Sequence, residues 1–165
     1  MELWDIFNKN GEPTGKTVKR GNLRLRSGEY HMVVHIWISG PDGRWLIQRR
    51  SDNKQPMPGE WAATGGSVIA GETSLDAAMR ELSEELSITP NKNDFNFVER
   101  IFRRHSFVDM WHLHFGGDIN SLTLQKDEVA EVRWVSQDEL RGMIADGKFH
   151  DYGSRYFKTV FSIKK

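Results

Sequence analysis

The sequence predicts a single α/β domain built around a mixed central sheet. Three observations predict it: strand-like and helix-like segments alternate along the chain, turn signals between neighbouring strands indicate hairpins, and 165 residues with 38% hydrophobic content suit one domain with a sizeable core. The chain has no cysteine, which excludes disulfides, thiolate metal sites and a cysteine nucleophile. Lysine plus arginine and aspartate plus glutamate number 23 each, so no global field favours nucleic acid or membranes.

The first segments predict an N-terminal β-hairpin extension over residues 1–28. Residues 3–7 (LWDIF) are expected to form a strand, and Asn10-Gly11 is a hairpin-type turn signal. The basic, polar stretch 17–25 is expected to be a second, exposed strand or loop.

The next segments predict the centre of the sheet. Residues 31–38 (HMVVHIWI) alternate too weakly for a half-exposed strand and therefore indicate a buried one. Pro41-Asp42-Gly43 turns the chain into a strand at 45–48, which completes a hairpin. A surface loop is expected at 51–60, followed at 61–68 by a strand and a glycine turn.

The second half is expected to hold a central helix, three strands and two further helices. Thr73 begins the central helix, because Asp76 three residues later completes a capping box. The remaining expected elements are strands at 97–103 and 110–119 around a turn near Val108-Asp109, a strand at 132–135, and helices at 137–146 and 152–162.

The central helix carries an acidic face beside its apolar face. With Arg80 at zero and about 100° per residue, Glu84, Glu81 and Glu85 lie at about 40°, 100° and 140°. The apolar positions lie between about 200° and 260°; they are Leu75, Met79, Leu82 and Leu86. Like charges at spacings of three and four destabilise a helix by a few tenths of a kcal/mol each, so either solvent or a cation must compensate them.

Two further features favour a cation. Gly65-Gly66 and Gly71 come just before the helix, where glycine lets backbone carbonyls and amides approach a ligand closely. Glu72 adds a carboxylate, and Arg80 can fix a carboxylate by paired hydrogen bonds. Fixed carboxylates and a backbone carbonyl form an oxygen-only cage, which suits Mg²⁺ or Mn²⁺.

This spacing resembles a known family. Gly66, Glu72 and the run Arg80 to Ile88 (RELSEELSI) are similar to the box of the Nudix hydrolases, here over residues 65–88. The chain departs from the family pattern at Ser87, where the family has the glycine that ends the helix.

The resemblance implies an α/β/α sandwich with a mixed central sheet, formed by a single domain over residues 1–165. It also implies metal-dependent hydrolysis of a diphosphate bond in a nucleoside diphosphate derivative, by water attack at phosphorus. By position, Glu81, Glu84, Glu85 and the carbonyl of Gly65 match metal ligands. Arg80 and Glu72 match the orienting pair, and Gly66 is a structural position. Which glutamate acts as the base, and how many metal ions bind, stay open.

The N-terminal region resembles the isopentenyl-diphosphate isomerase-like branch of the family. That branch carries a cysteine acid/base and metal-binding histidines, whereas this chain has Gly65, Ser67 and Arg24 at the matching positions and retains only His31. Hydrolysis is therefore preferred. The alternatives are an isomerase-like enzyme and a nucleotide-sensing domain with no catalysis.

Residues outside the box supply further candidates. Arg49 and Arg50, with Gln48 and Lys54, could grip phosphate oxygens, or could equally form a solvated strand end. Family members often supply another catalytic or metal-binding glutamate from a distal loop; Glu128 is favoured over Glu131.

Weaker signals favour ordinary roles. His112 and His114 could bind metal, but packing or surface roles are favoured. Core positions are favoured for most of four tryptophans, one of which is a plausible base-stacking residue near the pocket; they are Trp37, Trp45, Trp61 and Trp111. The expected partner is a small-molecule diphosphate, with no membrane or specific nucleic acid, and a homodimer is left open. No signal-peptide or membrane-span pattern is present, so a cytoplasmic location is expected.

Overall fold

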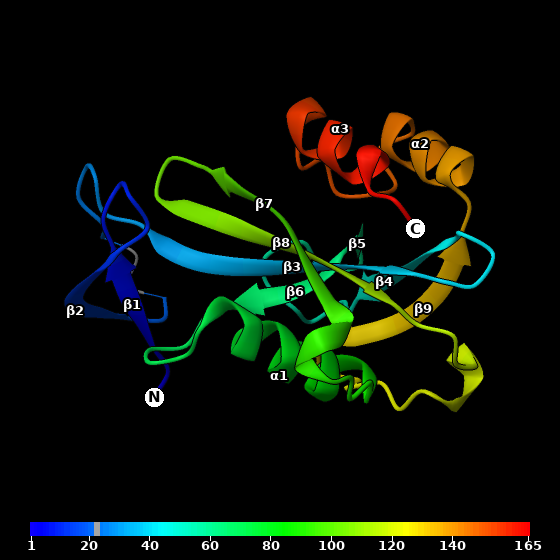
Figure 1. The fold of residues 1–165 in the computed structure, drawn as a ribbon, viewed down its shortest axis with the longest axis horizontal. Coiled ribbons are helices and arrows are strands. Elements are labelled where there is room, and N and C mark those ends of the chain that lie inside the picture. The colour runs from blue at the N-terminus through cyan, green and yellow to red at the C-terminus, as the bar shows by residue number, and fades with distance from the viewer. Residues whose placement is uncertain (22–23) are drawn as a thin grey trace.

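The computed structural model describes residues 1–21 and 24–165 and has a mixed sheet between helices (Figure 1). The strands are β1 Leu3–Phe7, β2 Pro13–Lys19, β3 His31–Ser39, β4 Trp45–Arg50, β5 Trp61–Ala62, β6 Thr64–Ser67, β7 Phe95–Phe102, β8 Ser106–His114 and β9 Val129–Val135. The α-helices are α1 Ser74–Leu86, α2 Gln137–Ala145 and α3 Ser154–Ser162, and short 3₁₀ helices cover Lys92–Asp94 and Ile119–Ser121. No helix in the described ranges is long and apolar enough to cross a membrane.

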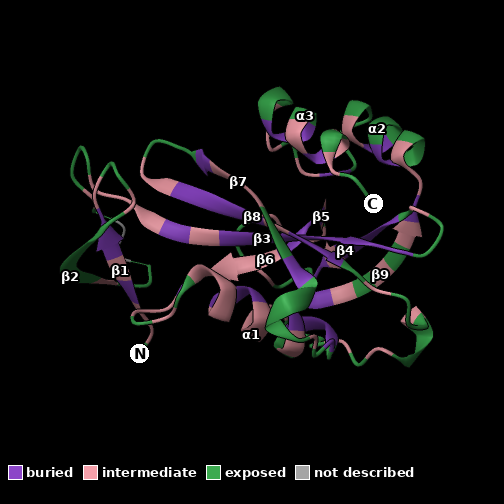
Figure 2. Cartoon of the chain, viewed as in Figure 1, coloured by how far each residue is buried: buried purple, intermediate pink, exposed green. Residues whose placement is uncertain are grey.

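The central sheet has seven strands, with the order β5-β4-β3-β8-β7; β6 also pairs with β3, and β9 with β4. The β3–β8 pair is parallel and the other pairs are antiparallel, so the predicted mixed sheet is confirmed. Helix α1 covers one face, while α2 and α3 cover the other (Figure 1). The outward surfaces of α2 and α3 are exposed, whereas most of β3 and β8 is buried or half-buried (Figure 2).

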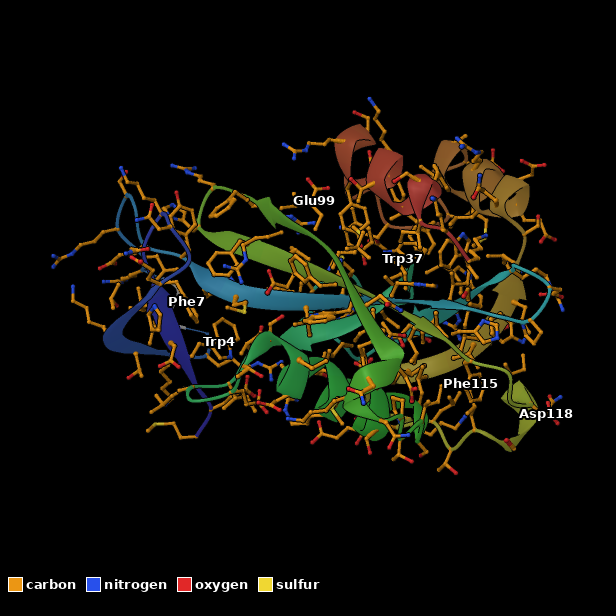
Figure 3. All side chains as sticks on the ribbon, in the orientation of Figure 1. Trp4, Phe7, Trp37, Glu99, Phe115 and Asp118 are labelled. Atoms are coloured by element: carbon orange, nitrogen blue, oxygen red, sulfur yellow. The ribbon has the colours of Figure 1, made fainter. Side chains whose placement is uncertain are left out.

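Strand β3 is buried on both faces, as predicted, because its side chains alternate between two cores. Val34, Ile36 and Ile38 pack in the core that includes α1. Trp37 packs between the sheet and the C-terminal helices (Figure 3). The strand therefore fixes the position of groups on both sides of the sheet.

The predicted N-terminal hairpin is present as a two-stranded sheet of β1 and β2. It docks on the segment before α1, because Ala70 N–H donates to Leu3 O (2.8 Å) and Gly71 N–H donates to the Asp5 carboxylate (2.8 Å). The exposed second strand covers 13–19, and positions 22–23 of the expected 17–25 segment lie outside the described residues.

Two sequence predictions were wrong about turns. Gly65 and Gly66 lie inside β6, paired with His35 and Val34, and do not form a turn. The β7–β8 turn lies at residues 103–105, whereas Val108 and Asp109 are buried inside β8. Asp109 is tolerated there because Arg100 on β7 donates two hydrogen bonds to it, at 2.6 and 2.8 Å.

Helix α1 begins at the predicted N-cap, and it ends at Ser87, where the sequence departs from the family glycine. Thr73 is the N-cap, and a complete capping box links it to Asp76. At the other end Ser87 adopts the left-handed conformation (φ 57°) that glycine usually supplies, and its hydroxyl donates to Thr123 O at 2.9 Å.

Candidate active site

A cleft of about 680 Å³ opens beside α1, and its lining combines segments from both ends of the chain. Five glutamates line it, and they are Glu2 near the N-terminus, Glu81, Glu84 and Glu85 of α1, and Glu128 just before β9. Five cationic side chains also line it, and they are Arg20, Arg50, Lys54, Arg80 and Arg103. A hollow of about 710 Å³ between α2 and α3 has only one carboxylate in its lining, Asp151, so the chemistry is concentrated in the cleft.

Arg80 is the organising side chain of the acidic face. Its guanidinium binds Glu72 in a bidentate pair, with N–O distances of 2.7 and 3.0 Å. It also donates to Glu81 (2.7 Å), to Glu84 (3.3 Å) and to the carbonyl of Ser67 (3.1 Å). The hydrogen bonds to Glu72 raise the pKa of Arg80, although burial opposes them. The Arg80 guanidinium thus links helix α1 to strand β6.

The two glycines of β6 are required by close packing. A Cβ on Gly66 would overlap the carboxylate of Glu81. A Cβ on Gly65 would overlap the backbone carbonyl of Val34 on the neighbouring strand. The absence of a side chain at Gly66 therefore lets the Glu81 carboxylate pack directly against the backbone of β6, and both glycines line the cleft.

Glu85 is the most buried of these glutamates, with 3% of its surface exposed. Gln48 on β4 donates to it from Nε2 at 3.0 Å, and Thr64 Oγ1 donates to Gln48 Oε1, which fixes the orientation of the amide. Burial, together with the charge of Glu81, raises the pKa of Glu85 to about 7. Gln48 therefore positions the Glu85 carboxylate and is not available to bind a phosphate group.

Glu81 shares this environment. Burial raises its pKa, although the hydrogen bond and charge of Arg80 oppose the shift. The site thus holds two carboxylates whose charges the protein compensates incompletely.

The two candidate glutamates outside the box, Glu128 and Glu131, lie in different places relative to the cleft. Glu128, just before β9, lines the cleft and forms an ion pair with Lys54, whose pKa is lowered by burial. Glu131 lies within β9 opposite Arg49, at 3.6 Å from its Nε. The structure thus brings Glu128 into the cleft and leaves Glu131 outside its lining.

The side chains of the adjacent β4 arginines, Arg49 and Arg50, also lie in different places relative to the cleft. Arg49 pairs with Asp52 (3.1 Å) and with Glu131, outside the cleft lining. Arg50 lines the cleft and donates from Nε to Pro56 O at 3.1 Å. Of these two arginines, only Arg50 is therefore placed to contact a ligand in this cleft.

Sequence reasoning missed the other end of the cleft, which is lined by His35, Arg103, His150 and Tyr152. These residues are up to 117 positions apart in the chain, and the one local signal is His35 within an apolar strand. None of the four tryptophans lines the cleft, and Trp37 and Trp45 are fully buried in the core. His112 and His114 instead share the hydroxyl of Ser39.

Comparison with known proteins identifies the family of the chain. The family model of the NUDIX domain matches residues 29–155, so the chain belongs to this family. It is an enzyme of the Nudix hydrolase class, which acts on phosphoric anhydrides. An uncharacterized Nudix hydrolase of Listeria monocytogenes is 39% identical over 99% of this chain and 96% of the relative. Nudix hydrolase 3 of Arabidopsis thaliana is 35% identical over 87% of this chain, but over only 20% of that much longer protein.

Solved structures agree on the fold. A Deinococcus radiodurans crystal structure superposes with a TM-score of 0.79 at 22% identity, covering 99% of this chain and 100% of the other. The NUDIX domain of Shewanella oneidensis NrtR, complexed with ADP ribose, gives a TM-score of 0.57 at 15% identity over 76% and 82% of the two chains. The predicted sandwich with a mixed central sheet is thus confirmed.

Proposed function

We propose that this protein is a Mg²⁺- or Mn²⁺-dependent pyrophosphohydrolase that cleaves a diphosphate bond in a nucleoside diphosphate derivative. Residues 1–165 would act as one domain, with the hairpin of residues 1–28 packed on the box at 65–88. One observation carries the proposal: four glutamates from α1 and the loop before β9 line a single cleft beside the glycine strand β6.

The donor set fits a hard divalent cation. Carboxylate and carbonyl oxygens are the ligands that Mg²⁺ and Mn²⁺ prefer, and the raised pKa values of Glu81 and Glu85 indicate charges that a cation would compensate. Glu81, Glu84, Glu85 and the carbonyl of Gly65 are the proposed ligands. When bound, such a metal neutralises phosphate charge and lowers the pKa of bound water.

The carboxylates must turn to bind it. In the described part of the chain, no three acidic or imidazole groups already surround one point. Arg80 holds Glu81 and Glu84, while Lys54 holds Glu128. These two cations therefore stabilise the metal-free site.

The chain's own residues have distinct proposed roles. Arg80 and Glu72 orient Glu81, and Gln48 orients Glu85. Arg50 is placed to hold phosphate oxygens, and Lys54 could join it after release from Glu128. A base among Glu81, Glu84, Glu85 and Glu128 takes a proton from the attacking water, whose oxygen bonds to one phosphorus. The bond from that phosphorus to the bridging oxygen breaks, and the other phosphate leaves with the bridging oxygen.

The site favours hydrolysis over isomerisation. An alkene isomerase needs a protonating group at the strand before α1, and the branch that the N-terminal region resembles uses a cysteine there. Here that strand presents Gly65, Gly66 and Ser67, and the chain has no thiol. The intact carboxylates also favour catalysis over simple nucleotide sensing.

A product-release screen with Mg²⁺ or Mn²⁺ tests the proposal. Suitable compounds are nucleotide sugars, ADP-ribose, dinucleoside polyphosphates, oxidised nucleotides, capped RNA ends and prenyl diphosphates. Reaction in oxygen-18 water should place the label in a phosphate-containing product, because water is the nucleophile. Conversion of isopentenyl diphosphate to its isomer, with no diphosphate hydrolysed in the screen, would reverse the assignment.

A further inference from the structure

Strand β7 forms a free edge of the central sheet. It is the last strand in the order β5-β4-β3-β8-β7, and β8 is the one described strand that pairs with it. Among the described residues three large hydrophobic side chains are exposed, and two of them lie on this strand: Phe97 (52% exposed) and Phe102 (49% exposed), the third being Met1. A free strand edge with exposed apolar side chains is a template on which another strand can pair.

A β-bulge places both phenylalanines on the same face of the sheet. Positions 97 and 102 are five apart, and in a regular strand an odd separation puts two side chains on opposite faces. The register with β8 shifts between residues 97 and 99, which inserts one extra residue. Phe97 therefore lies on the α1 side, where its ring is 5.2 Å from that of Trp111, whose Nε1–H donates to the first residue of α1. Phe102 lies on the same side, with its ring 5.5 Å from that of Phe107 in the core that includes α1.

The charged side chains of β7 do not protect this edge. Natural edge strands commonly resist pairing through free charges or proline, and β7 contains neither lysine nor proline. Glu99 is bound on the α3 side by Arg155 (2.7 Å) and Thr159 (2.6 Å), as Figure 3 allows the reader to follow. Arg100 is bound by the buried Asp109 through two hydrogen bonds. The formal net charge of the chain is zero at pH 7, so no net repulsion opposes the approach of a second copy.

The order of side chains along β7 is self-complementary. In an antiparallel pair of two β7 strands, a two-fold axis at Arg100 places Glu99 of each copy opposite Ile101 of the other, and both of these lie on the α3 side. Counted across the bulge, the same axis places Phe97 of each copy opposite Phe102 of the other, and both of these lie on the α1 side. The two Arg100 side chains meet at the axis, but each is already bound by a carboxylate of its own chain. The bulge thus makes the two exposed rings match across the pair.

We propose that β7 is the interface of a homodimer, in which two copies pair their β7 edges antiparallel and join their central sheets into one continuous sheet. Phe97 of one copy packs against Phe102 of the other at both ends of the strand pair. The occupant is a second copy of this chain, because the alignment matches β7 with itself. The interface forms without metal or substrate, so it is independent of the proposed hydrolysis.

Sedimentation velocity of the full chain tests the dimer. Over about a hundred-fold range of protein concentration, the wild type should change from monomer to dimer. Phe97→Glu and Phe102→Lys should each weaken the association at least about ten-fold, because a charge would be buried against an apolar ring. Both positions are about half exposed in the single chain, so the variants should still fold, which circular dichroism checks.

Ala145→Glu is the matched control. Ala145 is exposed in the lining of the hollow between α2 and α3 and is not part of β7, so a charge there should leave the association unchanged. A wild type that is monomeric over the whole range, or a dimer that only Ala145→Glu disrupts, would overturn the proposal.

An equimolar mixture of the two β7 variants tests the register. In a dimer of either variant alone, both contacts place a charge against a ring. In the mixed dimer, one contact joins the introduced carboxylate to the introduced ammonium group, and the other keeps both phenylalanine rings. The mixture should therefore associate at least about ten-fold more strongly than either variant alone. A mixture that stays monomeric would overturn the pairing of Phe97 with Phe102.

Amide hydrogen exchange locates the interface in the wild type. Exchange in β7 should slow as the protein concentration rises, because its outward N–H groups become hydrogen-bonded. Exchange in β2, the outer strand of the N-terminal hairpin, should not change. Slowing in β2 and not in β7 would overturn the proposal and place the interface at the hairpin.

Discussion

The position of Glu81 depends on the absence of a side chain at Gly66. An alanine there would overlap a carboxylate that can turn away, whereas an alanine at Gly65 would overlap the backbone of Val34. We therefore expect Gly66→Ala to fold with nearly wild-type stability and to lose most activity. Gly65→Ala should instead lower the free energy of unfolding by about 1–3 kcal/mol, through strain in the β3–β6 pair. Urea denaturation and kcat measured on both variants check this contrast. Full activity in Gly66→Ala would contradict the geometry.

Glu84 tests the acidic cluster at its exposed edge. Its side chain is 53% exposed, and among the described residues only Arg80 binds it, at 3.3 Å, so Glu84→Gln should change the metal-free stability by a few tenths of a kcal/mol at most. The variant should lose about 10²-fold in kcat, or about 2.7 kcal/mol, because an amide is a poor ligand for a hard cation. Steady-state kinetics with Mn²⁺ provide the measurement.

Leu82→Ala is the control on the other face of α1. Leu82 is fully buried, so its truncation should reduce the free energy of unfolding by about 2–5 kcal/mol. The fraction that stays folded should turn over at close to the wild-type rate. A Glu84→Gln variant that unfolds, or that keeps full metal-dependent activity, would show that the cluster is structural.

At the scale of the element, α1 ends on a residue that is poorly suited to its conformation. Ser87 has a left-handed backbone, and its hydroxyl bond to Thr123 O offsets part of the strain. Both Ser87→Gly and Ser87→Ala remove that bond, but only alanine keeps the strain. Glycine should therefore be more stable than alanine at position 87 by about 1 kcal/mol. Thermal melting of the two variants checks the order.

At Gly142 in α2 the expected order is reversed, and alanine should be more stable than glycine. It lies inside the helix, and an added Cβ would meet nothing within 4 Å. Gly142→Ala should stabilise the protein by about 0.5–1 kcal/mol, because glycine is a poor helix former. Finding alanine favoured at both positions would mean that Ser87 carries no backbone strain.

At the scale of the whole molecule, metal should couple to stability. Mn²⁺ at about 100 times its dissociation constant should add about 2.7 kcal/mol and raise Tm by several degrees, and EDTA should reverse the rise. Burial raises the pKa of Glu85 to about 7, above its unfolded value of about 4.5. The free energy of unfolding of the metal-free protein should therefore fall as pH rises from about 4.5 to 7, because the buried carboxyl loses its proton. The shift produced by Mn²⁺ should consequently be larger at pH 8 than at pH 6. A melting curve indifferent to both additions would argue against the site.

His35 predicts a separate pH effect on folding. Its folded pKa of about 3 lies below the unfolded value of 6.5, so stability is complete above pH 6.5 and declines as pH falls toward 3. Between pH 6.5 and 5 this residue alone should cost about 2 kcal/mol. His35→Gln should remove that part of the slope in urea denaturation, while His114→Gln, at the exposed end of β8, should leave it. An unchanged slope in His35→Gln would contradict the neutral, buried ring.

The sequence by itself determined the local features: the buried strand β3, the hairpins, the capping box of α1, and the carboxylates of α1 with Arg80. These follow from spacing within one helix or strand, so no partner is needed to recognise them. The family and the α/β/α fold followed from the same residues. Predictions from the local sequence were wrong where polar or glycine residues inside strands were interpreted as turn residues. Asp109 is paired by Arg100 across two strands, and Gly65 and Gly66 serve close packing.

Only the tertiary structure decided which of several adjacent groups face the cleft. Arg49 and Arg50 point to opposite sides because side chains alternate along a strand, and Glu131 follows Arg49 because the β4–β9 register places them opposite each other. The part of the cleft lined by His35, Arg103, His150 and Tyr152 required β3, the β7–β8 turn and residues 150–152 to meet, which depends on the packing of α3 against the sheet. Register and long-range packing are set by the whole core, and no short stretch of sequence contains them.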